Sequence, residues 1–177
     1  MFNDMCYDMK DSQRRNKKTA DLSVGNFIQE LTATCVIFLP SELELAPTPL
    51  QYEMQRSLGT LPGSRSEEDH YWYDWAVMDA RAYLYFLQYL VSSKLHKDAH
   101  RNVAMDNIRA EIDWDDHQMG HKDTACNLLG WIYMQEGRLA EAARCFTQSW
   151  RIRPYHNAAK FHMRDLIARM SGTQSNC

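Results

Sequence analysis

The sequence contains no apolar run long enough to cross a membrane. Its longest, Tyr83–Val91, includes Gln88 and has about half the length that a bilayer span needs. The N-terminus holds Asp4, Asp8 and Asp11 and no apolar core segment, so we expect no signal peptide. Five widely spaced cysteines without a CxxC pair argue against a disulfide framework or a zinc finger. The sequence therefore predicts a cytoplasmic protein with no membrane anchor and no cofactor.

Catalytic motifs are lacking as well. There is no Gly-rich phosphate loop, nucleophile elbow, paired catalytic carboxylate motif or Cys–His signature. His96 with His100, and His117 with His121, stand four residues apart, a spacing that lets two imidazoles bind one metal on a helix. No Glu follows the first His as in zinc proteases, and both pairs fall at expected turns. We interpret them as solvated turn residues and expect neither a metal site nor an enzyme.

Positive charge is scarce in the middle of the chain. Residues 21–122 carry 8 basic and 16 acidic side chains, whereas residues 123–177 carry 7 basic and 4 acidic ones, and the net charge is −3. Nucleic-acid binding needs clustered Lys and Arg, so the acidic middle is a poor platform for it. Six basic residues of the C-terminal part have two interpretations, an ordinary charged surface or an anion-binding strip. They are Arg138, Arg144, Arg151, Arg153, Lys160 and Arg164.

Apolar periodicity predicts an all-α protein. No stretch shows β-branched alternation between hairpin turns, so we expect essentially no sheet. Residues 67–95 have the pattern of one long helix or two abutting helices. The other predicted helices are Asn26–Leu39, Leu50–Leu58, Asp98–Trp114, Thr124–Gln135, Leu139–Arg151 and Tyr155–Met170.

A tetratricopeptide pattern covers Asp123–His156. Its period is about 34 residues, and seven positions match at fixed offsets: Leu129, Gly130, Tyr133, Gly137, Ala142, Phe146 and Pro154. Small Gly130 and Ala142 would let two antiparallel helices approach closely, with the larger side chains filling the wedge between them. Gly137 would take a positive φ at the turn, and Pro154 would end the second helix.

One such hairpin cannot bury its faces alone, so similar hairpins should flank it. The preceding pair, Ala80–Leu95 and Ala99–Trp114, lacks the small residues and is interpreted as a degenerate repeat. The predicted architecture is a short right-handed superhelix of antiparallel helix hairpins. Its expected segments are a disordered leader (1–20), N-terminal helices with a loop (21–66), the degenerate repeat and linker (67–122), the tetratricopeptide repeat (123–156) and a capping or partial-repeat helix with a tail (157–177).

A narrower resemblance rests on the order of these segments. A weak hairpin containing AYLYFLQYL and an acidic linker, DWDDHQMGH, precede LLGWIYMQEGRLAEA, in which Trp131, Tyr133, Gly137, Arg138, Leu139 and Ala142 carry the match. Over residues 26–150 the chain resembles the N-terminal part of the interferon-induced proteins with tetratricopeptide repeats. The resemblance implies a role in innate antiviral defence. Some members bind the 5′-triphosphate end of RNA in a basic channel, but no RNA-contact residue of the family can be placed here.

The first helix of a tetratricopeptide hairpin lines the concave groove of the stack. In the strong repeat the groove positions are Thr124, Asn127, Trp131, Met134 and Gln135, a polar and aromatic surface suited to a protein or peptide partner. The leading hypothesis is therefore a non-enzymatic adaptor. Packing of this groove against another helix of the same chain, RNA-end binding, self-association and a fragment of a longer repeat array stay open as alternatives.

Two further groups have a structural and a functional interpretation. Eight aromatic residues lie between Tyr71 and Tyr89, and their near-helical spacing favours core packing. Tyr71, Tyr73 and Tyr85 would be the surplus that forms an exposed patch. Cys126 and Cys145 fall at helix-facing positions, where we expect small buried side chains rather than nucleophiles.

Overall fold

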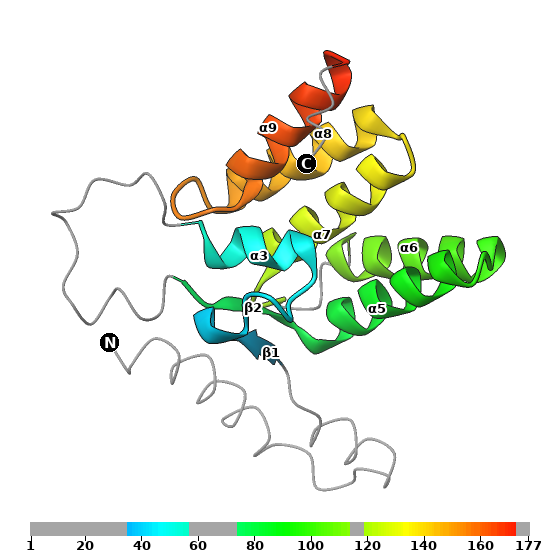
Figure 1. Cartoon of the computed structure of the whole chain (residues 1–177), viewed down its shortest axis with the longest axis horizontal. Helices are drawn as coiled ribbons and strands as arrows, with labels where there is room; N and C mark the ends of the chain where they lie inside the picture. Colours follow the sequence, from blue (N-terminus) through cyan, green and yellow to red (C-terminus); the bar gives the residue numbers. More distant parts are fainter. Residues whose placement is uncertain (1–34, 57–73, 114–118, 173–177) are drawn as a thin grey trace, which may run out of the picture. The chain divides into compact units, whose positions relative to one another are not determined.

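The structure is a computed structural model that describes residues 35–56, 74–113 and 119–172 (Figure 1). These residues are mostly helical, which confirms the helical class. Along the chain, the elements are strand β1 (Cys35–Phe38), the 3-10 helix η1 (Pro40–Glu42), α3 (Thr48–Met54), strand β2 (Ala76–Asp79), α5 (Ala80–Lys94), α6 (Asp98–Asp113), α7 (Lys122–Gln135), α8 (Leu139–Ile152) and α9 (Ala159–Met170). None of the helices in these ranges has the length and apolar character of a membrane span.

The expectation of no sheet was wrong. β1 and β2 pair antiparallel, with Cys35 opposite Asp79 and Phe38 opposite Ala76. In β2 burial alternates, since Ala76 and Met78 are fully buried while their neighbours are not, as expected for a strand with one face on the core. Residues 35–38 were predicted as the end of a helix, whose remainder lies outside the described residues. The pairing partners are about forty positions apart, so local periodicity could not reveal them.

Helices α7 and α8 form the hairpin that the repeat pattern predicts. A Cβ atom placed on Gly130 would lie 2.4 Å from Cε1 of Phe146, so only a glycine admits this approach. The nearest side chain to Gly130 is thus Phe146 rather than the expected Ala142, which is itself fully buried. The space that Gly130 leaves is occupied by the ring of Phe146, and the predicted contact between Gly130 and Ala142 stays a prediction.

The turn and the end of this hairpin also follow the prediction. Gly137 has a φ of +72°, and the Arg138 amide donates to the Tyr133 carbonyl in the pattern of a Schellman cap. At the other end, α8 stops at Ile152 and Arg153 is extended (φ −134°, ψ 94°), the conformation that a following proline imposes. Pro154 therefore ends the helix as expected.

Helices α5 and α6 form a second hairpin, which precedes α7 in the chain (Figure 1). Its turn is closed by an analogous bond from the Lys97 amide to the Ser92 carbonyl. The residue with positive φ is here His96 (φ +52°), which is not a glycine. Inside this hairpin Phe86 and Ile108 are fully buried. Helices α5 and α6 agree with the predicted Ala80–Leu95 and Ala99–Trp114 to within one residue at each described end. The helical pattern predicted for residues 67–95 is wrong at Ala76–Asp79, because this segment forms β2 and pairs with β1.

Short helix α3 lies against α7 and α9, and α9 packs along α8 (Figure 1). α3 begins with a proline-containing first turn, and Leu50 on it is fully buried. It ends at Met54, earlier than the predicted end at Leu58. α9 begins at Ala159 rather than Tyr155, after a segment in which His156 has a φ of +52°. The predicted groove is therefore bordered by a helix of the same chain.

Candidate partner-binding surfaces

The five predicted groove residues differ in how far they are exposed. Thr124, Asn127 and Met134 are buried, Trp131 is half-buried and Gln135 is exposed. α3 lies over the first part of α7, so the groove around Thr124 and Asn127 is filled by the chain itself. The expectation of an open groove at Thr124 and Asn127 was therefore wrong. The alternative, in which this part of α7 packs against another helix of the same chain, is correct there.

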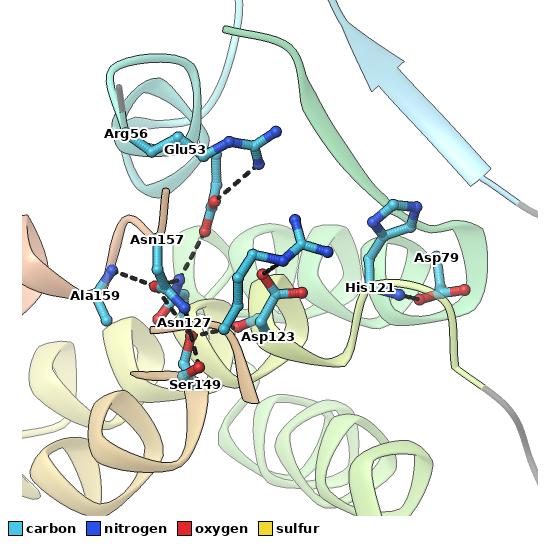
Figure 2. Close-up of polar contacts among 10 residues, drawn as sticks. Glu53, Arg56, Asp79, His121, Asp123, Asn127, Ser149, Asn157 and Ala159 are labelled. Carbon is cyan, nitrogen blue, oxygen red and sulfur yellow. Dashed lines mark hydrogen bonds and ion pairs between the residues drawn. The ribbon is translucent and has the colours of Figure 1, made fainter. Parts of the chain in front are cut away.

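A buried polar network joins α3, α7, α8 and the start of α9 (Figure 2). The Asn127 side-chain amide donates to Glu53 Oε1 at 2.7 Å and to Asn157 Oδ1 at 3.2 Å. Asn157 donates in turn to the Ser149 carbonyl at 2.9 Å. The Ser149 hydroxyl donates to the Asp123 carbonyl at 2.9 Å. Asn127 therefore holds three helices together rather than facing a ligand.

Two buried carboxylates accompany this network. Glu53 is 1% exposed and lies 3.5 Å from Nη1 of Arg56, while Asp123 lies 3.3 Å from Nε of Arg153. Burial raises the pKa of Glu53, and the nearby Asp123 carboxylate raises it further, while Arg56 opposes both. Each carboxylate is therefore buried and paired with an arginine of the same chain, and neither faces an open groove.

His162 on α9 is enclosed by aromatic rings. Its imidazole stacks on Phe146 with 5.0 Å between ring centroids, and Tyr52 of α3 meets it edge-on at 5.0 Å. The Tyr52 hydroxyl also donates to Asp165, which links α3 to α9. Burial lowers the pKa of His162 to about 3, so the ring is neutral near pH 7. Through Tyr52, this cluster gives α3 a second set of contacts beside those of Glu53.

Three of the four histidines that stand four residues apart lie in the described residues. His96 and His100 are exposed, as expected. His121 is half-buried, which corrects its interpretation as a solvated residue: its amide donates to Asp79 at 2.9 Å (Figure 2), and burial lowers its pKa. His117 lies outside the described residues. Within the ranges that the structure covers, no group of three possible ligands is close enough to hold a metal ion.

The cysteines and aromatics largely behave as packing residues. Cys126 is buried in the core and Cys145 packs against it, and burial raises their pKa values to about 12 and about 11. Neither thiol is therefore a thiolate at neutral pH. Tyr85 was expected in an exposed patch but packs against the core. Tyr71 and Tyr73 lie outside the described residues.

Two apolar grooves remain open on the outer sides of the hairpins. The α8–α9 groove has a volume of about 560 Å³ and is lined by Thr147, Trp150, Lys160, Met163, Arg164 and Ile167. The α5–α6 groove, of about 550 Å³, is lined by Leu87, Gln88, Val91, Ser92, Ala99, His100 and Val103. Large apolar side chains are exposed in both, including Ile167 (62%) and Val91 (56%).

Sequence reasoning missed these grooves because it assigned one face to each helix. α9 carries two: Ala159, His162 and Leu166 are buried, whereas Met163 and Ile167 lie on the side that faces the groove. Both sets have helical spacing of three or four. The signal was therefore present in the sequence, but only the packing shows which set another helix covers.

Comparison of the chain with protein-family models, with curated proteins and with solved structures finds no match. The surfaces described above are thus the basis for any functional assignment.

Proposed function

We propose that this chain is a non-enzymatic protein-interaction module built from tetratricopeptide-type helix hairpins. The observation that carries the proposal is the pair of apolar grooves on the outer sides of α5–α6 and α8–α9. Stacked helical repeats normally end in a polar face, because an uncovered apolar face favours association. Here two such faces remain open within the described residues.

The hairpin α7–α8 supports the tetratricopeptide part of the proposal. Its glycine contact, its glycine turn and its proline stop follow the repeat pattern, and a further helix packs on it from the C-terminal side. A longer array is compatible with the same geometry, since another helix would lie in the α8–α9 groove. In either case the module acts by binding a helix or a protein surface.

Binding of an RNA end is the competing proposal. Residues 138–170 carry seven basic and two acidic side chains, which favours an anionic ligand. Against it, α3 covers the concave position of the groove, and the polar side chains there are buried and paired within the chain. We therefore favour a protein partner, and gel-shift of 5′-triphosphate RNA at low and high salt provides the test between them.

The proposal is tested by quantitative pull-down of cellular proteins with the full chain as bait. Three variants are compared with wild type: Trp150→Ser with Ile167→Ser in one groove, Val91→Ser with Val103→Ser in the other, and Leu45→Ser as a control. Leu45 is 81% exposed and belongs to neither groove.

We expect one groove variant to lose a defined set of partners that wild type and the Leu45→Ser control both retain. Circular dichroism and thermal melting must be unchanged. If all variants recover the same proteins in equal amounts, the grooves are not interaction surfaces and the proposal fails.

A further inference from the structure

The two walls of the α8–α9 groove are helices whose apolar and basic side chains alternate. On α9, Lys160 and Arg164 are four residues apart, as are Met163 and Ile167, and all four line the groove. This part of α9 spans eight residues, so its first and last Cα atoms lie roughly 10 Å apart along the helix axis. The groove is therefore a straight trough about two helical turns long.

The opposite wall continues this arrangement. Thr147 and Trp150 of α8 line the groove, and Arg144 and Arg151 lie three residues before and four residues after Thr147 on the same stripe. Arg144 and Arg151 form no ion pair within the part of the chain that the structure describes. Basic side chains thus border the apolar floor on both sides.

Carboxylates are scarce around the groove. None of its lining residues is acidic. The acid next in sequence, Asp165, already accepts hydrogen bonds from Tyr52 and Arg164. Arg164 in turn already has Asp165 as its acidic partner. A ligand that matches this surface must offer apolar side chains to the floor and negative charge to the other basic side chains beside it.

We propose that the α8–α9 groove binds one face of an amphipathic helix that carries acidic side chains along its flanks. Its anchors would repeat at intervals of three or four residues, because two parallel helical walls accept one apolar stripe of a third helix. Trp150 (40% exposed) and Ile167 (62% exposed) are the main contacts on the two walls. This inference rests on the proposed interaction function and specifies its ligand.

The test uses a phage-displayed library of random 16-residue peptides, selected against the full chain. We expect enriched peptides to combine apolar residues at helical spacing with an excess of Asp and Glu. Binding of a labelled enriched peptide is then measured by fluorescence anisotropy, beside a matched peptide in which every Glu is replaced by Lys.

The expected result is at least a tenfold loss of affinity in the variant with Trp150→Ser and Ile167→Ser. The variant Val91→Ser with Val103→Ser, whose side chains are equally exposed in the other groove, should bind normally. Affinity should also fall with Lys160→Glu and with added salt, because both weaken the attraction between the rims and the peptide.

Each of the following results would overturn the inference. If the enriched peptides lack an excess of Asp and Glu, an acidic helix is not the ligand. If their affinity is unchanged by Trp150→Ser with Ile167→Ser, they bind outside the α8–α9 groove. A dimer in sedimentation equilibrium that this variant dissociates would assign the groove to a second copy of the chain. If no peptide is enriched while the pull-down still finds groove-dependent partners, this inference fails alone. If both are negative, the interaction module fails with it.

Discussion

The two helix hairpins of this protein have the same topology but reach it by different means. In α7–α8 a glycine lies against the ring of Phe146, and a second glycine takes the positive φ of the turn. In α5–α6 there is no glycine at all, and His96 occupies the strained turn position. Small residues at fixed offsets therefore indicate a hairpin with one specific close contact. The other hairpin is held together by apolar side chains along one face of each helix.

This difference explains why one hairpin was easy to identify and the other was not. A glycine contact restricts both the residue and its offset, so it leaves a pattern in the sequence. An amphipathic pair accepts many apolar side chains and leaves only periodicity. The difference between the two hairpins can be tested by substitutions in the core and at the turns, and by the pH dependence of stability at His162.

The largest effect is expected from Phe146→Ala. Its fully buried ring fills the space over Gly130, so truncation should lower the free energy of unfolding by about 4 kcal/mol. Val91→Ala in the first hairpin, at a side chain that is 56% exposed, should cost less than about 1 kcal/mol. Urea unfolding measures both changes in the free energy of unfolding. Equal changes would contradict the distinction between the packed core at Phe146 and the open groove at Val91.

A double-mutant cycle isolates the contact itself. Gly130→Ala alone should destabilise by about 2 kcal/mol through overpacking. Combined with Phe146→Leu, which makes room for the new methyl group, the two changes should cost less than the sum of their separate effects by at least about 0.5 kcal/mol. Strict additivity would show that Gly130 and Phe146 do not restrict each other.

The second effect concerns the acid response of His162. Its pKa is about 3 in the folded protein and near 6.5 when unfolded, so the unfolded chain binds more protons between these values. Stability should therefore fall as the pH is lowered from 6.5 towards 3, because the unfolded chain takes up a proton at His162 that the folded chain does not. His162→Phe should keep the stack on Phe146 and abolish this part of the loss.

Glu53 also titrates, and its contribution to the free energy of unfolding changes with pH in the opposite direction to that of His162. Burial raises its pKa above the ordinary value, so its contribution to stability falls as the pH rises through the raised pKa. Chemical unfolding at a series of pH values should be analysed as the difference between wild type and His162→Phe, in which the Glu53 contribution cancels. A difference that does not change with pH would mean that His162 is not buried as a neutral ring.

The smallest effect is expected at the two turns, and here the hairpins should respond oppositely. Gly137→Ala places a Cβ on a residue with φ +72° and should cost about 1 kcal/mol, although nothing crowds the position. His96→Gly relieves the same strain in the first hairpin and should be neutral or stabilising by up to about 1 kcal/mol. Thermal melting of the two variants provides the measurement, and shifts in the same direction would contradict the comparison.

Much of the helical framework was predictable from single residues. Gly130, Gly137 and Pro154 each have a local steric reason for their positions, and the helix bounds around them are confirmed. The strand pair β1–β2 was missed, because each strand has only four residues and its partner lies far away in the sequence. The role of Asn127 was also misjudged. Its repeat position marks a groove, but nothing in its own segment reveals that Glu53 of α3 would fill it.

The sequence alone predicted most helices of the described residues and the turn of the α7–α8 hairpin, since these depend on apolar periodicity and on backbone conformation at single positions such as Gly137. The tertiary structure alone decided which apolar faces are covered. Burial of a face depends on the free energy gained when a distant segment packs on it, as α3 does over Asn127. No such segment covers the α8–α9 groove in the described residues, and that uncovered face is the basis of the proposed function.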